Sequence, residues 1–250
     1  MNTICGKEEC GIHDTENASI SIGGSSYKLG AGQVLDTGDM FQIKNRRYVS
    51  VPFRPVFAPT IAERGPQVIL PHDASVMVSF SGITNGSRVI ESGVGSGILS
   101  AFILWEIGEE GLLKSIDISS DNIQIARKNL EKFGIDHGHE YIAGDIRNFD
   151  DGDRYDAVFL DIPDPWNAMK ACSRLLKKGG TLVTYSPNFN QVEKAVVSME
   201  ESSIFHHVSM ELTRRNLIVR KDATRPDSKG VGHTGFISVG YRYASNDTTI

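Results

Sequence analysis

A glycine-rich loop between an apolar strand and an apolar helix constrains the fold of this chain more than any other segment. The strand ends at Val89-Ile90, Glu91 follows it, and a helical run begins at Ile98. Glycine lets the backbone turn sharply and lets a ligand lie close to exposed amides, which a Cβ atom would prevent. The pattern predicts a nucleotide-cofactor loop in an α/β domain, although many α/β proteins carry such glycines for packing alone. The three glycines are Gly93, Gly95 and Gly97.

The spacing of these glycines narrows the choice of cofactor. G-x-G-x-G departs from the dinucleotide pattern G-x-G-x-x-G, and Glu91 stands two residues before the first glycine. S-adenosylmethionine has no pyrophosphate for the helix N-terminus to hold, so this loop suits it. We therefore expect S-adenosylmethionine as the cofactor, with a nicotinamide-dependent oxidoreductase as a distant alternative.

Strands and helices alternate after the loop. We expect strands near 88–90, 112–116, 141–143, 157–160 and 181–185, with helices between them. Repeated βα units imply right-handed crossovers and a parallel sheet covered on both faces. Two last strands, near 205–212 and 236–243, have no helix of ordinary length between them and should pair antiparallel. The sequence thus predicts a Rossmann-like α/β domain with a seven-stranded, mostly parallel sheet whose last strand is antiparallel.

The rest of the chain divides into an N-terminal segment and a small β domain. Residues 1–17 are expected to be disordered, as the first residues of many domains are. Cys5, Cys10 and His13 could instead supply metal ligands. The chain has three cysteines, which is not the even number of a disulfide framework. Residues 18–62 alternate polar and apolar side chains between glycines, which is typical of short strands and tight turns. Prolines make 51–71 an extended connector, and residues 63–250 form the α/β domain.

Composition limits the environment and the partners. With 40% hydrophobic and 23% charged residues and no apolar run of about 18, we expect a soluble protein without a membrane span. The first residues lack the basic and apolar segments of a signal peptide, which favours the cytoplasm. A net charge of −5 argues against a uniformly basic nucleic-acid binder but leaves local patches open. Basic residues cluster at Lys44, Arg46 and Arg47 and at Arg214, Arg215, Arg220, Lys221, Arg225 and Lys229.

Acidic residues follow the predicted strands at the edge where ligands bind in such sheets. Asp117 stands about 20 residues after the glycine loop, the spacing at which an acid reaches a ribose, although a helix cap or a turn residue is the alternative. Asp145 is placed to accept from an adenine amine and Ile146 to pack on the ring, although a turn acid explains Asp145 equally well. No metal is expected, because the acids lie on separate strand ends without a histidine at ligand spacing.

The strongest local signal after the loop is Asp161-Ile162-Pro163-Asp164-Pro165-Trp166. Two prolines stiffen the chain that leaves the fourth strand and leave its carbonyls free to accept hydrogen bonds. Asp161 should project into the site. Trp166 is either a stacking wall or a core residue of the next helix, and we favour the core.

At this point the chain resembles the tRNA (adenine-58-N1)-methyltransferases in their archaeal and bacterial single-subunit form, from about Arg64 to Tyr243. The glycine loop is common to class I methyltransferases, whereas D-x-P-x-P-W together with the tail is specific. The resemblance implies a homotetramer, S-adenosylmethionine as donor and a tRNA T-loop adenine as acceptor. The motifs that carry it are Gln67–Asp73, Glu91–Gly97, Asp161–Trp166, Tyr185–Pro187, Arg225-Pro226 and Val231–Phe236.

The same resemblance implies roles for individual residues. Asp161 would be catalytic and face the target adenine. The cofactor would be bound by Glu91, Gly93, Gly95, Ser96, Gly97, Asp117, Ile118, Asp145, Ile146 and Asp161. The substrate would be bound by Gln67, Pro163, Tyr185, Arg225 and His233. Leu70 and His72 depart from the usual tyrosine and lysine, which leaves the target nucleotide open.

Two other functions stay open on the sequence. A class I methyltransferase for a small molecule or a protein carboxylate would carry the same loop, Asp117 and Asp145. A non-catalytic RNA-binding partner subunit would share the fold, but it should have lost either the loop glycines or Asp161, and both are intact here.

Overall fold

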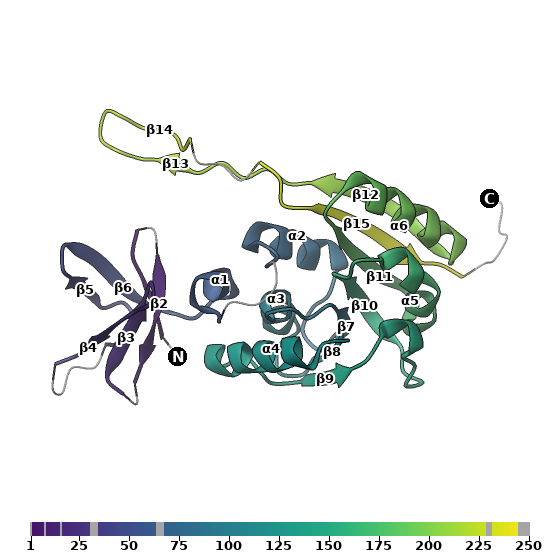
Figure 1. Ribbon diagram of the computed structural model, residues 1–250, viewed down its shortest axis with the longest axis horizontal. Helices are drawn as coiled ribbons and strands as arrows, with labels where there is room; N and C mark the ends of the chain where they lie inside the picture. The colour runs from purple at the N-terminus through teal and green to yellow at the C-terminus, as the bar shows by residue number, and fades with distance from the viewer. Residues whose placement is uncertain are drawn as a thin grey trace.

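Two sheets lie toward opposite ends of an elongated molecule, and a long β arm extends from the larger domain toward the smaller one (Figure 1). The computed structural model describes residues 2–7, 9–15, 17–30, 35–63, 68–228 and 232–244. No helix in these ranges is long and apolar enough to cross a membrane.

The small domain is a six-stranded antiparallel sheet in the order β4-β3-β2-β1-β6-β5. Alternation along β3 turns Ile20 and Ile22 inward, where they meet Ile4 and Tyr48 in a separate core. Its strands are β1 (Asn2–Cys5), β2 (Cys10–Asp14), β3 (Ser19–Ile22), β4 (Ser25–Lys28), β5 (Met40–Ile43) and β6 (Arg46–Pro52).

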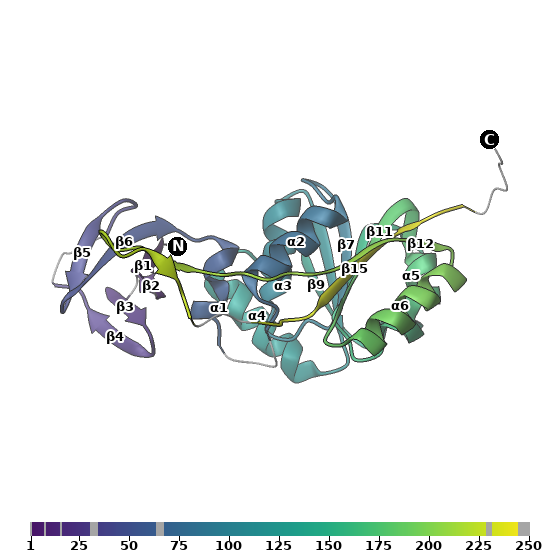
Figure 2. The same ribbon diagram turned by 90° about the horizontal axis from the view of Figure 1, so that it is seen from above.

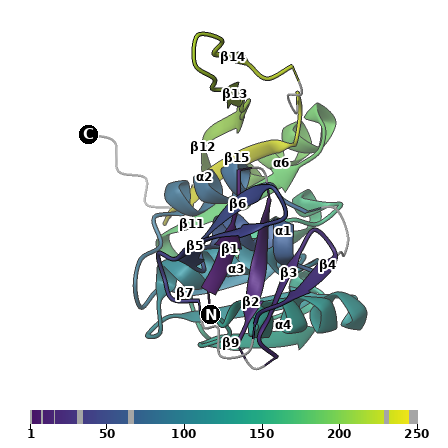
Figure 3. The same ribbon diagram turned by 90° about the vertical axis from the view of Figure 1, so that its left-hand side faces the viewer.

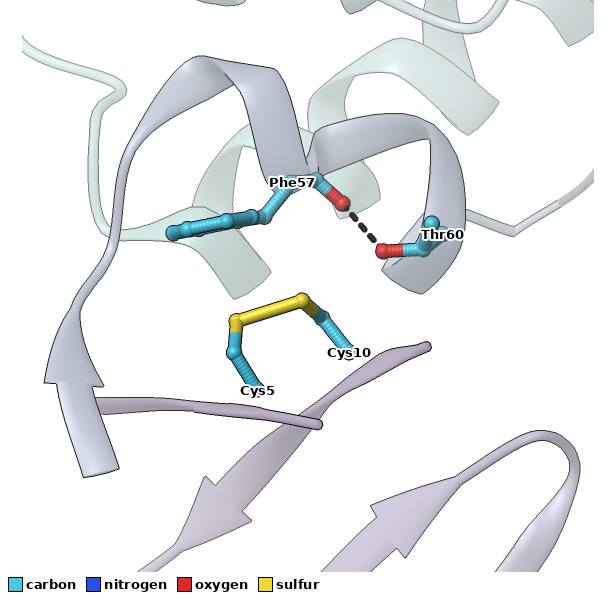
Figure 4. The surroundings of a disulfide bond; sticks show 4 residues. All are labelled: Cys5, Cys10, Phe57 and Thr60. Carbon is cyan, nitrogen blue, oxygen red and sulfur yellow. Dashed lines mark hydrogen bonds between the residues drawn. A yellow bond between two sulfur atoms is a disulfide. The ribbon is translucent and has the colours of Figure 1, made fainter. Parts of the chain in front are cut away.

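The N-terminal segment is ordered where the structure describes it, so the expectation of disorder for 1–17 was wrong there. Strand β1 pairs with β2 and also with β6, more than 40 residues away. Cys5 and Cys10 stand opposite each other in this ladder and form a disulfide beside Phe57 and Thr60 (Figure 4). Both thiols are therefore used, which removes them as metal ligands. The odd cysteine, Cys172, is a buried core residue.

The proline-rich connector is not extended in its described part, contrary to expectation. Pro55 begins the short helix η1 (Pro55–Phe57), Pro59 lies in the first turn of α1 (Ala58–Ile61), and Pro71 begins α2 (Pro71–Ser81). Proline is favoured at the first turn of a helix because its missing N–H has no intrahelical partner there. The prolines thus start three short helices between the two sheets.

The large sheet has the order β12-β15-β11-β10-β7-β8-β9, and β15 is antiparallel to both neighbours, as predicted. The other neighbouring strands pair in parallel. Its elements after α2 are β7 (Arg88–Ser92), α3 (Ile98–Ile107), β8 (Leu112–Asp117), α4 (Ser120–Phe133), β9 (His139–Ala143), η2 (Ile146–Asn148), β10 (Tyr155–Leu160), η3 (Pro165–Ala168), α5 (Met169–Leu175), β11 (Leu176–Ser186), α6 (Phe189–Glu201), β12 (Ile204–Glu211) and β15 (Phe236–Arg242).

Helices cover both faces of this sheet (Figure 2). Along the central strand β10, Ala157 and Phe159 point into the core under α2, α3 and α4, whereas Val158 and Leu160 point into the core under α5 and α6. All four side chains are fully buried, which explains why this strand reads as an unbroken apolar run. Helix α4 is capped by Ser119, whose hydroxyl accepts from the Asn122 N–H.

The arm lies between β12 and β15. It contains the two-stranded ribbon β13 (Leu217–Ile218) and β14 (Arg225–Pro226), and it stands away from the body of the larger domain (Figure 3). The arm reaches the end of the molecule that holds the small domain (Figures 1 and 2).

Candidate active site

A cavity of about 550 Å³ opens at the carboxyl ends of the parallel strands. The loops after β7, β8, β9, β10 and β11 all contribute to its wall, so the strand-end residues singled out in the sequence meet in one place. The predicted site residues that line it are Gly93, Gly95, Asp117, Ile118, Asp145, Ile146, Asp161, Pro163 and Tyr185.

The three loop glycines meet three different surroundings. Gly93 has φ +89°, and a Cβ atom on it would lie 2.0 Å from the Asp161 carbonyl oxygen. Gly95 has φ +54°, no atom lies within 4 Å of the position its Cβ would take, and the residue lines the cavity. Gly97 packs on α4, where its Cβ would lie 3.0 Å from that of Ala126. The loop therefore lies against the end of β10 at Gly93, leaves room for a ligand at Gly95 and packs on α4 at Gly97.

Asp117 ties the end of β8 to the glycine loop. Its Oδ2 accepts from the Val94 N–H at 3.0 Å and the Gly95 N–H at 3.4 Å, and its Oδ1 accepts from the Ser119 N–H at 2.8 Å. The Asn122 amide donates to both oxygens at 3.3 Å. Asp117 is thus a turn residue and not the cap of α4, and its contact with a ribose stays a prediction.

Three residues assigned to the cofactor do not line this cavity, so their contact with the cofactor stays a prediction. The Glu91 carboxylate is fully buried, and its Oε2 accepts from Ser100 Oγ at 2.6 Å and Ser115 Oγ at 2.8 Å. Ser96 is buried, and its carbonyl accepts from the Asn129 amide. Gly97 faces α4, as described above. Burial raises the pKa of Glu91 to about 7 in spite of its two hydroxyl donors.

Asp161 stands at the end of β10 with its carboxylate in the cavity. Its N–H donates to the Ser92 carbonyl at 2.9 Å, so β7 fixes the backbone from which the side chain projects. Burial, and then the charge of Asp117, raise the pKa of Asp161 to about 7. The carboxylate is consequently poised between its neutral and charged forms near neutral pH.

Asp145 lines the cavity and also forms a turn, so the turn interpretation is confirmed and its contact with an adenine amine stays a prediction. Its Oδ1 accepts from the Arg147 N–H at 2.9 Å, and the Arg147 Nε–H lies within hydrogen-bond distance of both carboxylate oxygens. These bonds lower the pKa of Asp145. Arg147 also donates to Asp164 at 2.8 Å and lines the cavity, so it joins the loops after β9 and β10. The sequence analysis did not predict a role for Arg147. The pattern that could have indicated it is a basic residue two positions after an acid at the end of a strand.

Tyr185 links three of the sequence motifs. Its hydroxyl donates to Asp73 Oδ2 at 3.0 Å, and Asp73 is fully buried in the first turn of α2. A Cβ atom on Gly235 would lie 2.3 Å from Tyr185 Cζ, so the tail packs directly on this ring. Burial and the Asp73 charge raise the pKa of Tyr185, which keeps the phenol protonated as a donor.

Two other predicted substrate residues, Arg225 and His233, do not line the cavity. His233 lies outside it, with Nδ1 2.6 Å from Glu211 Oε1 and Nε2 3.0 Å from the Pro187 carbonyl oxygen. Arg225 lies on β14 in the arm and is exposed. Gln67 falls outside the described residues. Trp166 is half-buried beneath Lys194 of α6, 4.8 Å from its ring centre, and is neither a wall of the cavity nor a fully buried core residue.

Two further features were missed from the sequence. The Gln191 amide donates to the Pro163 carbonyl at 2.9 Å and lines the cavity from α6. Leu70 and His72, the two departures from the family pattern, line a second cavity of about 610 Å³ that also contacts Cys10 in the small domain and Arg214 in the arm. Their partners are far away in the sequence, so no local pattern indicated this cavity.

Comparisons with known proteins agree with this geometry. The family described as the tRNA methyltransferase complex GCD14 subunit matches residues 55–234. A Methanocaldococcus jannaschii protein named tRNA (adenine(57)-N(1)/adenine(58)-N(1))-methyltransferase TrmI is 31% identical over 197 residues, which cover 68% of this chain and 70% of that protein. A Thermus thermophilus protein named tRNA (adenine(58)-N(1))-methyltransferase TrmI is 32% identical over 168 residues, 67% of this chain and 66% of that protein.

Solved structures show the same fold over almost the whole chain. The tRNA (m1A58) methyltransferase TrmI from Aquifex aeolicus has a TM-score of 0.81 at 21% identity and covers 98% of this chain and 97% of its own. A SAM-dependent O-methyltransferase from Thermotoga maritima has a TM-score of 0.83 at 22% identity, with 99% and 94% covered. The family resemblance and the Rossmann-like fold inferred from the motifs are thus confirmed, and the chain belongs to the GCD14 family of tRNA methyltransferases.

Proposed function

We propose that this protein transfers a methyl group from S-adenosylmethionine to N1 of an adenine in the T-loop of tRNA, at position 58, its neighbour or both. Family membership makes the chain a tRNA methyltransferase that uses this cofactor. The observation that carries the finer proposal is the position of Asp161. Its carboxylate lies in the cavity with the glycine loop and Tyr185, on a backbone held by β7.

The cavity residues fit S-adenosylmethionine. Gly95 lines the cavity, and no atom lies within 4 Å of the position its Cβ would take, so a ligand has room against this backbone. Asp117 and Asp145 offer acceptors for hydroxyl and amine groups, and Ile118 and Ile146 offer apolar contact. When bound, the cofactor would supply the sulfonium methyl group, and breaking its sulfur–carbon bond would leave a neutral thioether. Gly93 contributes indirectly, because its missing side chain lets the loop lie against the Asp161 backbone.

Asp161 is proposed to orient the target adenine. Adenine N1 carries a lone pair in the ring plane, so no strong base is required before attack. As the new bond forms, the base becomes cationic, and a carboxylate that accepts from its N6 amine stabilises this charge by on the order of a few kcal/mol. Holding the two reactants together supplies much of the remaining rate, since the transfer becomes effectively unimolecular.

Basic residues of the arm are proposed to bind the RNA backbone. To reach N1, the adenine must leave its stack, and the protein must hold the folded RNA meanwhile. Arg214, Arg215, Arg220, Lys221 and Arg225 are all exposed in the described part of the arm. In the small domain, Arg46 is already paired with Glu9 at 2.7 Å, so Lys44 and Arg47 are the better phosphate contacts there.

We also propose that the protein is a cytoplasmic homotetramer. Sedimentation of the purified protein tests the oligomeric state.

The test is to incubate the protein with labelled S-adenosylmethionine and unmodified tRNA, and then to identify the methylated nucleoside. We expect N1-methyladenosine from the wild type and none from Asp161→Ala, which should still bind the cofactor. Label in a small molecule or a protein but in no tRNA would contradict the proposal. Normal turnover by Asp161→Ala would contradict the assigned role of this carboxylate alone.

A further inference from the structure

An exposed phenylalanine stands beside the active-site cavity without a role in the reaction described above. Phe189 is the first residue of α6 and is 73% exposed. Its neighbours along the chain, Pro187 and Gln191, both line the cavity. A single exposed apolar side chain is common on protein surfaces and needs no explanation by itself. The surroundings of this one distinguish it.

One side of the Phe189 ring is supported by a built aromatic cluster. Its ring centre lies 4.6 Å from that of Phe236, which is buried at the start of β15. The Phe236 ring in turn lies 4.8 Å from His233. His233 is held by Glu211 at 2.6 Å and by the Pro187 carbonyl at 3.0 Å. The Phe189 ring is therefore held on one side while most of its surface faces solvent.

The backbone under Phe189 is also fixed. The Asn188 side chain caps α6 by accepting from the Gln191 N–H at 3.0 Å. Phe236 pairs with Ser186 of β11 and with Glu211 of β12, which places the cluster at the same edge of the sheet as the cavity. Phe205 offers a contrast. It is 61% exposed, but it lies at the start of β12, at the end of the strands opposite the cavity.

We propose that Phe189 stacks on a nucleobase of the RNA substrate that neighbours the methylated adenine. An aromatic ring with one supported side and one open side is a stacking platform, and every base offers a π-face to it. The inference rests on the proposed function, since it needs an RNA whose target base enters the cavity. It goes further by assigning a contact outside the cavity to a residue for which the family motifs gave no role.

The experiment measures the Kd of unmodified tRNA for Phe189→Ala, Phe189→Trp and the matched control Phe205→Ala at one fixed salt concentration. Because one base stack contributes about 1–3 kcal/mol, Phe189→Ala should weaken binding about tenfold. Phe189→Trp should bind as the wild type does, and Phe205→Ala should be unchanged. Affinity for S-adenosylmethionine should be the same in all four proteins, because Phe189 does not line the cavity.

Coupling to the RNA identifies the contact as stacking. T-arm RNAs with a single abasic site at each position beside the target adenine are compared in wild type and Phe189→Ala. At one position, loss of the base should weaken wild-type binding about tenfold and leave the variant unaffected. Equal losses in both proteins at every position would overturn the inference. Unchanged tRNA affinity in Phe189→Ala would also overturn it. Sedimentation of Phe189→Ala that differs from that of the wild type would overturn it too, because Phe189 would then be a contact between copies of the chain. A wild type that methylates no tRNA would instead overturn the proposed function.

Discussion

At the scale of single residues, two buried carboxylates share a raised pKa but face different surroundings. Glu91 lies behind the cavity wall against two serine hydroxyls, whereas Asp161 opens into the cavity. Burial raises the pKa of each to about 7, and Asp117 adds to the effect at Asp161. The same physical effect therefore influences stability at one position and, we propose, catalysis at the other.

Replacing Glu91 by glutamine tests its effect on stability. The folded protein keeps the Glu91 proton up to about pH 7, whereas the unfolded carboxyl loses it near its ordinary pKa of 4.5. The free energy of unfolding should therefore fall as the pH rises through this window, by up to about 3 kcal/mol. Glu91→Gln cannot titrate, so it should be more stable than the wild type at pH 8, and the difference should shrink toward pH 4.5.

Urea unfolding of both proteins at pH 8 and pH 5 measures this difference. The same side chain also tests the cofactor role that the sequence assigned to it. If Glu91→Gln binds S-adenosylmethionine as the wild type does, Glu91 supports the loop and does not contact the cofactor. A variant that is less stable by the same amount at both pH values would show that the hydroxyl contacts, and not the raised pKa, decide the contribution of Glu91.

Asp161 should impose a pH dependence on the rate. The ionised carboxylate stabilises the cationic base more than the neutral acid does, and the pKa of Asp161 in the free enzyme is raised to about 7. We expect kcat/KM for S-adenosylmethionine to rise about tenfold per pH unit up to about pH 7 and then level off. The midpoint for kcat should lie lower, because a bound sulfonium favours the charged carboxylate. Glu91→Gln is the control that separates the two acids, and its profile should match the wild type. A flat profile would remove Asp161 from the reaction.

At the scale of elements, the glycine loop and the end of β10 form one unit. Gly93→Ala would place a Cβ atom 2.0 Å from the Asp161 carbonyl oxygen and would strain a backbone at φ +89°. Strain and overpacking together should cost roughly 2–5 kcal/mol of stability and displace Asp161. Gly95→Ala is the matched control, since no atom lies within 4 Å of its Cβ. It should cost only about 1 kcal/mol from its positive φ but weaken cofactor binding. Thermal unfolding and cofactor titration distinguish the two, and equal melting temperatures would contradict the close contact.

Local patterns were sufficient where an element depends on its own residues. The helical run expected from Ile98 begins there in the structure, because Gly97 and Gly108 flank the apolar residues of α3. Strands β1 and β2 were missed, since their order depends on pairing with β6 and on the Cys5–Cys10 disulfide. Neither contact leaves a periodic signal in the short N-terminal segment.

The site shows the same division. Strand-end position located Asp117 and Asp161, because parallel strands deliver their last residues to one edge. Position along the loop did not reveal that Gly97 faces Ala126 on α4, away from the cavity. The Asp73–Tyr185 hydrogen bond joins residues 112 apart in the chain, so no local spacing predicts it. What the sequence lacked was the direction in which each side chain points.

At the scale of the whole molecule, the distribution of charge is more informative than its sum. The chain carries a net charge of −5, yet the described arm holds five basic residues against Asp222 and Asp227. The arm extends to the end that holds the small domain, which carries Lys44 and Arg47 (Figures 1 and 2). An acidic protein of this shape can therefore present a basic surface to RNA while the opposite edge of the large sheet stays away from it.

Neutralising the tip of the arm tests this distribution. Each phosphate contact contributes about 0.7–0.9 to the slope of log K against log salt concentration, so Arg220→Gln with Lys221→Gln should reduce the slope for tRNA by about 1.5. Affinity for S-adenosylmethionine should not change, because no described residue of the arm lines the cavity. The matched control is Arg154→Gln with Lys178→Gln, which removes two exposed charges from the opposite edge of the large sheet. Both double variants change the net charge equally, so a uniform electrostatic effect would lower both slopes alike. A lower slope in the arm variant alone would mean that the arm itself contacts the RNA backbone.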